Sequence, residues 1–201
     1  MIAFVATALL AVTLEADPAH STAGFAVKHL MVSTVRGQFT KFTSTLELDE
    51  QDVTRSKVNV KIDAASIDTH TADRDKHLKS ADFFDVEKCP EITFVSTKIE
   101  KASDKYKVHG DLTMHCITKP VTLDASLTTK PIKTPFGTLV YPAGATGKVK
   151  RSEWGLKWNK AIEGGQLVSD DVELDLNVEY VAKPADATTQ TKTESKAATK
   201  K

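Results

Sequence analysis

The chain has 201 residues, 40% of them hydrophobic, which is enough for one domain with a core of its own. Its 27 basic residues balance 27 acidic residues, and this neutrality argues against a general nucleic-acid binder, whose domain normally carries a basic excess. No run of 18 apolar residues occurs, so the sequence predicts no ordinary membrane span.

The first 12 residues are almost entirely apolar, and no charged residue precedes Glu15. The length of this run fits the hydrophobic centre of a secretory signal, although no basic residue comes before it. We therefore expect residues 1–12 to be a signal segment, complete or truncated, and the protein to be exported. The alternative is that the run forms the first strand of a cytoplasmic protein, and the sequence leaves both open.

Strict alternation of apolar and polar residues dominates the middle of the chain. Such runs occur at 58–62, 106–116, 121–127 and 172–180, and less regularly at 25–27, 46–48, 92–94 and 143–149. A period of two predicts strands with one dry face and one wet face. We expect about eight strands, two of them long, near 37–49 and 106–117. Long amphipathic antiparallel strands favour a closed barrel or a sandwich, because closure removes exposed edges.

One charged segment breaks this pattern and predicts a helix. Residues 71–81 are rich in helix formers and lack a period of two. We expect a short helix near 72–80, with Thr71 or Asp73 as its N-cap and Leu78 as its inward-facing anchor. A helix inserted between two strands of a barrel is typical of a lid or plug across one end.

Further along the chain, two short segments predict breaks in the strands. Thr118-Lys119-Pro120 is typical of a turn, because proline cannot donate to a strand ladder. Residues 151–155 predict a strand end or bend. The segment 182–201 contains five lysines, two carboxylates and no aromatic residue, so we expect a disordered polar tail. A weak electrostatic tether to anionic lipid is the minority hypothesis for this tail.

Recognisable catalytic and metal-binding motifs are absent from the sequence. It contains no Gly-x-Ser-x-Gly elbow, no phosphate-binding glycine loop and no His-Glu-x-x-His motif. The six histidines are scattered, and we interpret them as hydrogen-bonded or exposed side chains rather than metal ligands. Cys89 and Cys116 lack the spacing of a zinc site, and either one disulfide or two free core thiols fits the sequence. We expect no metal, no cofactor and no enzymatic activity.

A series of short motifs runs through the chain in order. They are 17–29 (DPAHSTAGFAVKH), 35–39 (VRGQF), 67–69 (IDT), 74–86 (RDKHLKSADFFDV), 90–97 (PEITFVST), 110–115 (GDLTMH), 118–123 (TKPVTL) and 151–155 (RSEWG). Together they resemble the YceI-like polyisoprenoid-binding family. Each motif is weak alone, but their order over about residues 13–181 makes the resemblance specific to the whole domain.

The resemblance implies that residues 13–181 form an eight-stranded antiparallel lipocalin-like β-barrel around an elongated apolar cavity. It implies a non-catalytic protein that binds, stores or transports isoprenoid chains, such as polyprenyl phosphates or isoprenoid quinones. Members of the family are typically exported bacterial proteins, often periplasmic. A homodimer is compatible with such a barrel, although no sequence pattern supports one. Trp154 stands where the family more usually has phenylalanine, and its bulk would narrow the cavity if it faced inward.

The inward-facing apolar positions of the strands are the candidate cavity lining. They are Phe25, Val27, Phe39, Val60, Ile62, Phe83, Phe94, Leu112, Met114, Leu123, Trp154 and Leu176. For a polar headgroup the candidates are His29, Arg74 and Lys119. Two other hypotheses stay open. One is a fully packed barrel that acts as a structural, stress-related or interaction protein. The other is a lipid-modifying hydrolase, for which no nucleophile–base pair is visible.

Overall fold

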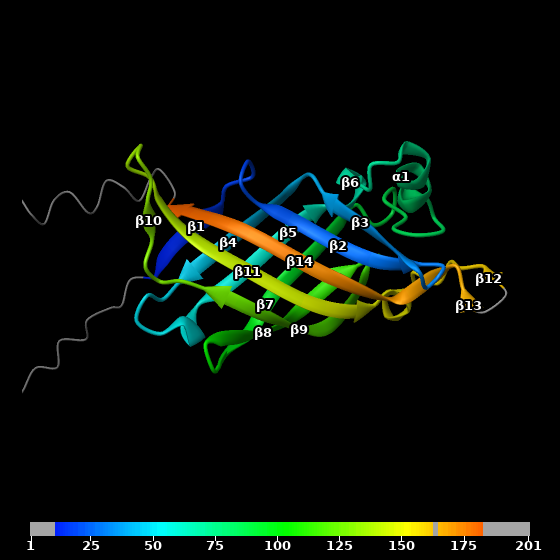
Figure 1. Ribbon diagram of the computed structural model, residues 1–201. Coiled ribbons are helices and arrows are strands. Elements are labelled where there is room, and N and C mark those ends of the chain that lie inside the picture. The colour runs from blue at the N-terminus through cyan, green and yellow to red at the C-terminus, as the bar shows by residue number, and fades with distance from the viewer. Residues whose placement is uncertain (1–10, 163–164, 183–201) are drawn as a thin grey trace, which may run out of the picture.

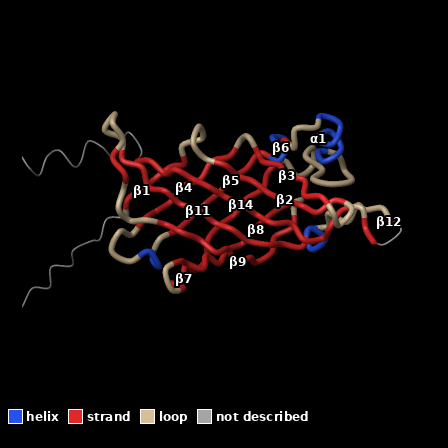
Figure 2. Tube along the Cα trace, in the orientation of Figure 1, coloured by secondary structure: helices blue, strands red, loops and turns tan. Residues whose placement is uncertain are grey.

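The computed structural model describes residues 11–162 and 165–182, and β-strands dominate it (Figure 2). The strands are β1 (Val12–Ala16), β2 (Thr22–His29), β3 (Ser33–Phe39), β4 (Phe42–Leu48), β5 (Lys57–Asp63), β6 (Ile67–Asp68), β7 (Glu91–Ala102), β8 (Lys105–Met114), β9 (Ile117–Leu127), β10 (Ile132–Lys133), β11 (Leu139–Lys150), β12 (Ala161–Ile162), β13 (Gly165–Gln166) and β14 (Val168–Ala182). The helical segments are α1 (Ala72–Lys79) and the 3₁₀ turns η1 (Val53–Arg55), η2 (Ala64–Ser66) and η3 (Arg151–Trp154).

Eight antiparallel strands close into a barrel, which confirms the predicted all-β fold. Around the barrel the order is β11-β9-β8-β7-β5-β4-β1-β14, and pairing of β14 with β11 closes the ring. These two strands pair continuously from Val140↔Val181 to Lys150↔Asp171. Alternate residues of every strand therefore face either the interior or the outside of the barrel.

The first two strands of the barrel are each broken into two pieces. β1 and β2 are the pieces of the first strand: β1 pairs with the end of β14, and β2 pairs with the earlier part of β14. β3 and β4 are the pieces of the second strand, and they pair with β2 and β1 respectively. The single long strand predicted near 37–49 is therefore wrong, because it is interrupted at Thr40 and Lys41. The backbone N–H groups of these two residues donate to the carbonyl oxygen and Oγ of Ser66, at 3.0 and 3.1 Å. Since Ser66 satisfies both donors, the strand can break there without leaving an unpaired amide.

Helix α1 lies at one end of the barrel, opposite the end where β1 begins (Figure 1). The short helix predicted near 72–80 is thus confirmed. Thr71 occupies the N-cap position, although its side chain makes no capping hydrogen bond. Within residues 11–162 and 165–182, no helix is long and apolar enough to cross a membrane.

The turn between β8 and β9 lies earlier than predicted. It is formed by His115 and Cys116, which have left-handed backbone angles of φ 49° and 58°. The expected turn at Thr118-Lys119-Pro120 is wrong, because these residues belong to β9. Pro120 lies in the part of β9 that pairs with β8, before pairing with β11 begins at Asp124. Pro120 therefore has a strand partner on one side only, and such an edge tolerates a missing N–H group.

A disulfide joins Cys89 and Cys116, with their Cα atoms 5.4 Å apart. Cys89 lies between α1 and β7, whereas Cys116 lies in the turn between β8 and β9. The bond settles the choice between a disulfide and two free thiols that the sequence left open. It also ties the segment that follows α1 to the rim of the barrel.

The ends of the chain bear on two predictions. Val12 begins β1 and Ala182 ends β14, so the described strands span the predicted domain over 13–181. The expected signal segment over 1–12 and the expected polar tail over 182–201 otherwise lie outside the described residues. Both stay predictions.

Candidate functional site

The barrel encloses an apolar cavity of about 260 Å³. Eleven of the twelve candidate residues line it: Phe25, Val27, Phe39, Val60, Ile62, Phe83, Phe94, Leu112, Met114, Leu123 and Leu176. They come from β2, β3, β5, β7, β8, β9 and β14 and from the segment after α1. Alternation places them there, because every second residue of a barrel strand faces inward. Whether these residues bind a ligand stays a prediction.

The exposure of the inward-facing side chains distinguishes a hollow barrel from a packed one. Leu174, Leu176 and Val178 line the cavity and are only partly buried, although they point away from the outer surface. By contrast, Leu14 and Leu48 are fully buried in the hydrophobic core and do not line the cavity. They lie on β1 and β4, at the end opposite α1 (Figure 1). The barrel is therefore tightly packed around β1 and hollow further along.

Aromatic side chains close the cavity at the α1 end. The ring of His77, on α1, lies 5.0 Å from the ring of Phe83 and 4.8 Å from that of Trp158, edge to face in both cases. Phe83 and Trp158 are themselves 5.2 Å apart. Phe84 stands edge to face with Phe39 on β3 at 5.8 Å. Phe39, Phe83 and Phe84 all line the cavity, so α1 and the segment after it act as its cover.

Several residues outside the predicted lining also reach the cavity. Leu78, the predicted anchor of the helix, does line the cavity, and so does its neighbour Phe84. Ser44 and Tyr180 also reach the cavity wall, where their hydroxyl groups hydrogen bond to each other at 2.6 Å. Burial raises the pKa of Tyr180, so its hydroxyl stays neutral. Two polar groups that satisfy each other leave the cavity wall effectively apolar.

Arg151 is the one charged side chain among the described cavity-lining residues, and it is buried. Its guanidinium group donates to the backbone carbonyl groups of Leu156, Trp158 and Ser169, the last two at 2.9 Å. Burial lowers the pKa of Arg151, and the nearby carboxylate of Asp170 partly offsets this effect. These bonds join the turn after β11 to the loop that follows it and to the start of β14. Arg151 therefore holds the α1 end of the barrel together.

The strand end predicted at 151–155 is a 3₁₀ turn, and the prediction that Trp154 lines the cavity is wrong. Trp154 is almost completely buried, and its Nε1 donates to the carbonyl oxygen of Leu112 at 3.1 Å. Its own carbonyl oxygen lies 2.9 Å from Nδ1 of His115. The turn ends at Gly155, which has a left-handed φ of 77°. This tight turn directs Trp154 into the protein beside the cavity rather than into it.

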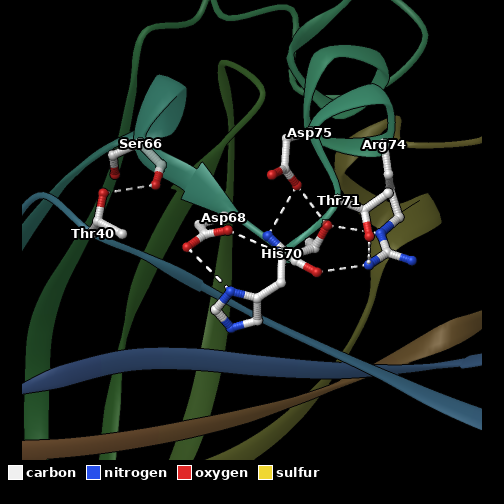
Figure 3. A network of polar contacts seen from close by, with 8 residues as sticks. Thr40, Ser66, Asp68, His70, Thr71, Arg74 and Asp75 are labelled. Atoms are coloured by element: carbon white, nitrogen blue, oxygen red, sulfur yellow. Dashed lines mark hydrogen bonds and ion pairs between the residues drawn. The ribbon is translucent and has the colours of Figure 1, made fainter.

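None of the three headgroup candidates lines the cavity. Arg74 is bound to the start of its own helix, where it donates to Thr69 and Thr71 (Figure 3). The carboxylate of Asp75 completes this network by accepting from the backbone N–H and the hydroxyl of Thr69. The network fixes α1 to Thr69, the residue that follows β6. The structural interpretation of Arg74 as part of a helix start is thus the one that the contacts favour.

The other two headgroup candidates share the strand parity of cavity-lining residues but do not themselves line the cavity. His29 follows Phe25 and Val27 in register at the end of β2, and it pairs with Val168. Lys119 pairs with Leu112, but its side chain is exposed. Neither side chain is in contact with the cavity as described. Across residues 11–162 and 165–182, no three metal-ligating side chains come together.

Comparison with known proteins places these features in a family. A YceI-like domain matches residues 14–180, which is nearly the whole barrel. The chain is 43% identical over 155 residues to UPF0312 protein plu2095 of Photorhabdus laumondii, covering 75% of this chain and 79% of that protein. It is 37% identical over 168 residues to Protein YceI of Escherichia coli O157:H7, covering 84% and 85% of the two chains.

Solved structures show the same fold. Burkholderia cenocepacia BcnA matches with a TM-score of 0.72 at 24% identity, covering 82% of this chain and 98% of that one. A polyisoprenoid binding domain from Saccharophagus degradans matches with a TM-score of 0.62 at 16% identity, covering 87% and 99%. At these identities the two structures support the architecture alone. The domain match and the two relatives show that the chain belongs to the YceI-like family.

Proposed function

We propose that this protein binds an elongated apolar lipid, a polyisoprenoid chain or an isoprenoid quinone, inside its barrel. The observation that carries the proposal is the interior cavity, whose lining comes from alternate residues of the strands and is almost entirely hydrocarbon. We take the class of ligand from the polyisoprenoid binding domain of Saccharophagus degradans, which has the same architecture. The protein would store or transport the lipid without changing it chemically.

The free energy of binding should come from burial of the ligand's hydrocarbon chain rather than from contacts with its polar headgroup. Each methylene group moved from water into such a cavity contributes about 0.8 kcal/mol, so a branched hydrocarbon chain can bind well without polar contacts. His29, Arg74 and Lys119 do not line the cavity, so none of them offers a charge to a buried headgroup. We infer that the hydrocarbon part of the ligand supplies most of the affinity.

The two alternative hypotheses have less support. A fully packed barrel does not fit the partly exposed inner face of β14. A hydrolase needs a nucleophile beside a base. In the described part of the cavity wall, Ser44 is hydrogen bonded to Tyr180, and no histidine or carboxylate lines the cavity.

The Cys89–Cys116 disulfide supports the expectation that the protein is exported. Disulfides persist in oxidising compartments such as the periplasm and are rare in the cytosol. We therefore favour a periplasmic or secreted protein over a cytoplasmic one. Cell fractionation of the native bacterium, followed by immunoblotting, would test this, and detection in the cytosol alone would refute it.

The ligand can be tested by organic extraction of the purified protein followed by mass spectrometry. We expect a prenyl lipid or quinone in a near-stoichiometric amount. Ala145 lines the cavity, whereas its neighbour Thr146 faces outward and is exposed. Ala145→Phe should lose most of the lipid because the ring fills the cavity, while Thr146→Phe should retain it. The proposal fails if wild-type protein is empty and also takes up no added polyprenyl lipid.

A further inference from the structure

The hairpin between β2 and β3 ends in three consecutive exposed apolar residues. Leu30, Met31 and Val32 are 45%, 58% and 84% exposed. Isolated apolar residues on a surface are ordinary, but a contiguous group at a protruding turn marks an interaction site. These three residues are called the hairpin tip below.

The backbone of the hairpin tip makes this composition unexpected. Leu30 and Met31 both have left-handed angles, φ 54° and 59°. They are the two central residues of a tight turn within a three-residue loop, since the N–H of Val32 donates to the carbonyl oxygen of His29 at 3.1 Å and His29 pairs with Ser33. Two consecutive left-handed residues strongly favour Asn-Gly, because residues with a larger side chain are strained in the left-handed region. Leucine and methionine thus work against the turn and also expose apolar surface to water. Neither folding nor solubility explains their presence.

The hairpin tip lies at the end of the barrel covered by α1 (Figure 1). It continues directly from β2 and β3, whose residues Phe25, Val27 and Phe39 line the cavity. The backbone N–H of Leu30 donates to the carbonyl oxygen of Leu167 at 2.8 Å, which fixes the tip to the residue before β14. The tip is therefore held at the rim, next to the cover of the cavity.

Exposed lysines accompany the hairpin tip. Lys28 precedes it on β2, and its Nζ donates to the hydroxyl of Thr34 at 2.8 Å. Lys160 lies beside the same rim, because its carbonyl oxygen accepts from the N–H of Leu167 at 3.1 Å. Apolar side chains flanked by lysine match a bilayer with anionic headgroups, where the former enter the hydrocarbon and the latter meet phosphates.

We propose that the hairpin tip inserts into the surface of an anionic phospholipid bilayer and docks the α1 end of the barrel there. This inference rests on the proposed function. A lipid chain could then pass between the bilayer and the cavity without crossing water. At the opposite end of the barrel, Leu14 and Leu48 are fully buried in the hydrophobic core.

The test is flotation of the full chain with vesicles of phosphatidylglycerol and phosphatidylethanolamine. The double variant Leu30→Asn/Met31→Gly gives the turn its preferred residues, so its fold should be at least as stable as that of the wild type. We expect its vesicle affinity to fall about tenfold or more, because two apolar side chains no longer enter the bilayer. Val32→Ser, which leaves the strained turn unchanged, should also weaken binding.

Phe136 provides a matched control. It is 95% exposed in the turn between β10 and β11. Figure 1 shows β10 at the opposite end of the barrel from α1. Phe136→Ser should bind vesicles like the wild type. All variants share the same chain ends, so differences among them report the mutated site alone. Replacing Lys28 by glutamate should weaken binding to these vesicles but not to phosphatidylcholine vesicles.

Three results would overturn the proposal. They are unchanged binding by Leu30→Asn/Met31→Gly, loss of binding in Phe136→Ser instead, and a wild-type dimer that the double variant converts to a monomer. The last would make the tip a contact between two copies of the chain. Extraction of the same proteins separates this proposal from the lipid-binding one. Unchanged vesicle binding with prenyl lipid still present refutes docking only, whereas wild-type protein that is empty and takes up no added polyprenyl lipid refutes the proposed function.

Discussion

Removal of the Cys89–Cys116 disulfide is expected to destabilise the barrel measurably. The bond closes a loop with a sequence separation of 27 residues. In the chain-entropy model, a crosslink over a loop of this length stabilises the folded state by about 3.5 kcal/mol, because it restricts the unfolded chain. Whole domains are stable by only about 5–15 kcal/mol, so this is a large share.

The measurement is urea unfolding followed by tryptophan fluorescence, for the oxidised protein, the reduced protein and the variant Cys89→Ala/Cys116→Ala. Urea lowers the free energy of unfolding by roughly 1–3 kcal/mol per molar for small proteins. We therefore expect the midpoint to fall by about 1–3.5 M urea when the bond is absent. The slope should rise slightly, since the unfolded chain without its crosslink exposes more surface.

Two observations would refute this reasoning. If the reduced and oxidised proteins unfold at the same urea concentration, the crosslink does not stabilise the barrel through the unfolded chain. If thiol labelling of the unreduced, denatured protein finds two free cysteines, the bond itself is absent. A reduced protein that unfolds earlier while Cys89→Ala/Cys116→Ala does not would indicate damage by the reductant instead.

Three further predictions concern stability and ionisation. Arg151→Met should lower the free energy of unfolding by about 3 kcal/mol or more, measured by urea titration, because buried carbonyl groups lose their donor. Gly110→Ala should cost about 1–3 kcal/mol in the same assay, because the new Cβ would lie 2.4 Å from Cζ of Phe94, and an unchanged midpoint would contradict this overlap. Burial and the neighbouring Glu50 raise the pKa of Tyr141 to about 12 in the folded protein, whereas the pKa is about 10 in the unfolded chain. The free energy of unfolding should therefore decline as the pH rises from 10 to about 12. Tyr141→Phe should remove the part of that decline that comes from Tyr141, with the matching ultraviolet absorbance step, whereas Tyr180, whose pKa burial also raises, keeps its own contribution.

Local pattern was enough to predict the wall of the barrel. Alternation in segments such as 172–180 depends on one strand at a time, and a barrel strand keeps its period of two along its whole length. The same pattern placed eleven of the twelve candidate residues on the cavity wall. Helix α1 could be predicted in the same way, because its charged residues lack a period of two.

Local pattern failed where a distant residue decides the conformation. The break at Thr40 depends on Ser66, a residue far along the chain whose carbonyl oxygen accepts a hydrogen bond from the backbone N–H of Thr40. Trp154 is directed away from the cavity by the turn that ends at Gly155, and its indole meets a carbonyl group on β8. The glycine after Trp154 is a signal of a left-handed turn, and it could have predicted the 3₁₀ turn but not the partner of the indole.

The sequence by itself therefore determined most of the strands, their inner and outer faces, the short helix and the family resemblance. These properties follow from the spacing of residues within one segment of the chain, without reference to any other segment. Only the tertiary structure decided that Cys89 meets Cys116, that Arg151 is buried among carbonyl groups, and that the barrel is hollow beyond Leu14. Each of these depends on how segments far apart in the chain approach one another, and on the volume left between them when the strands close.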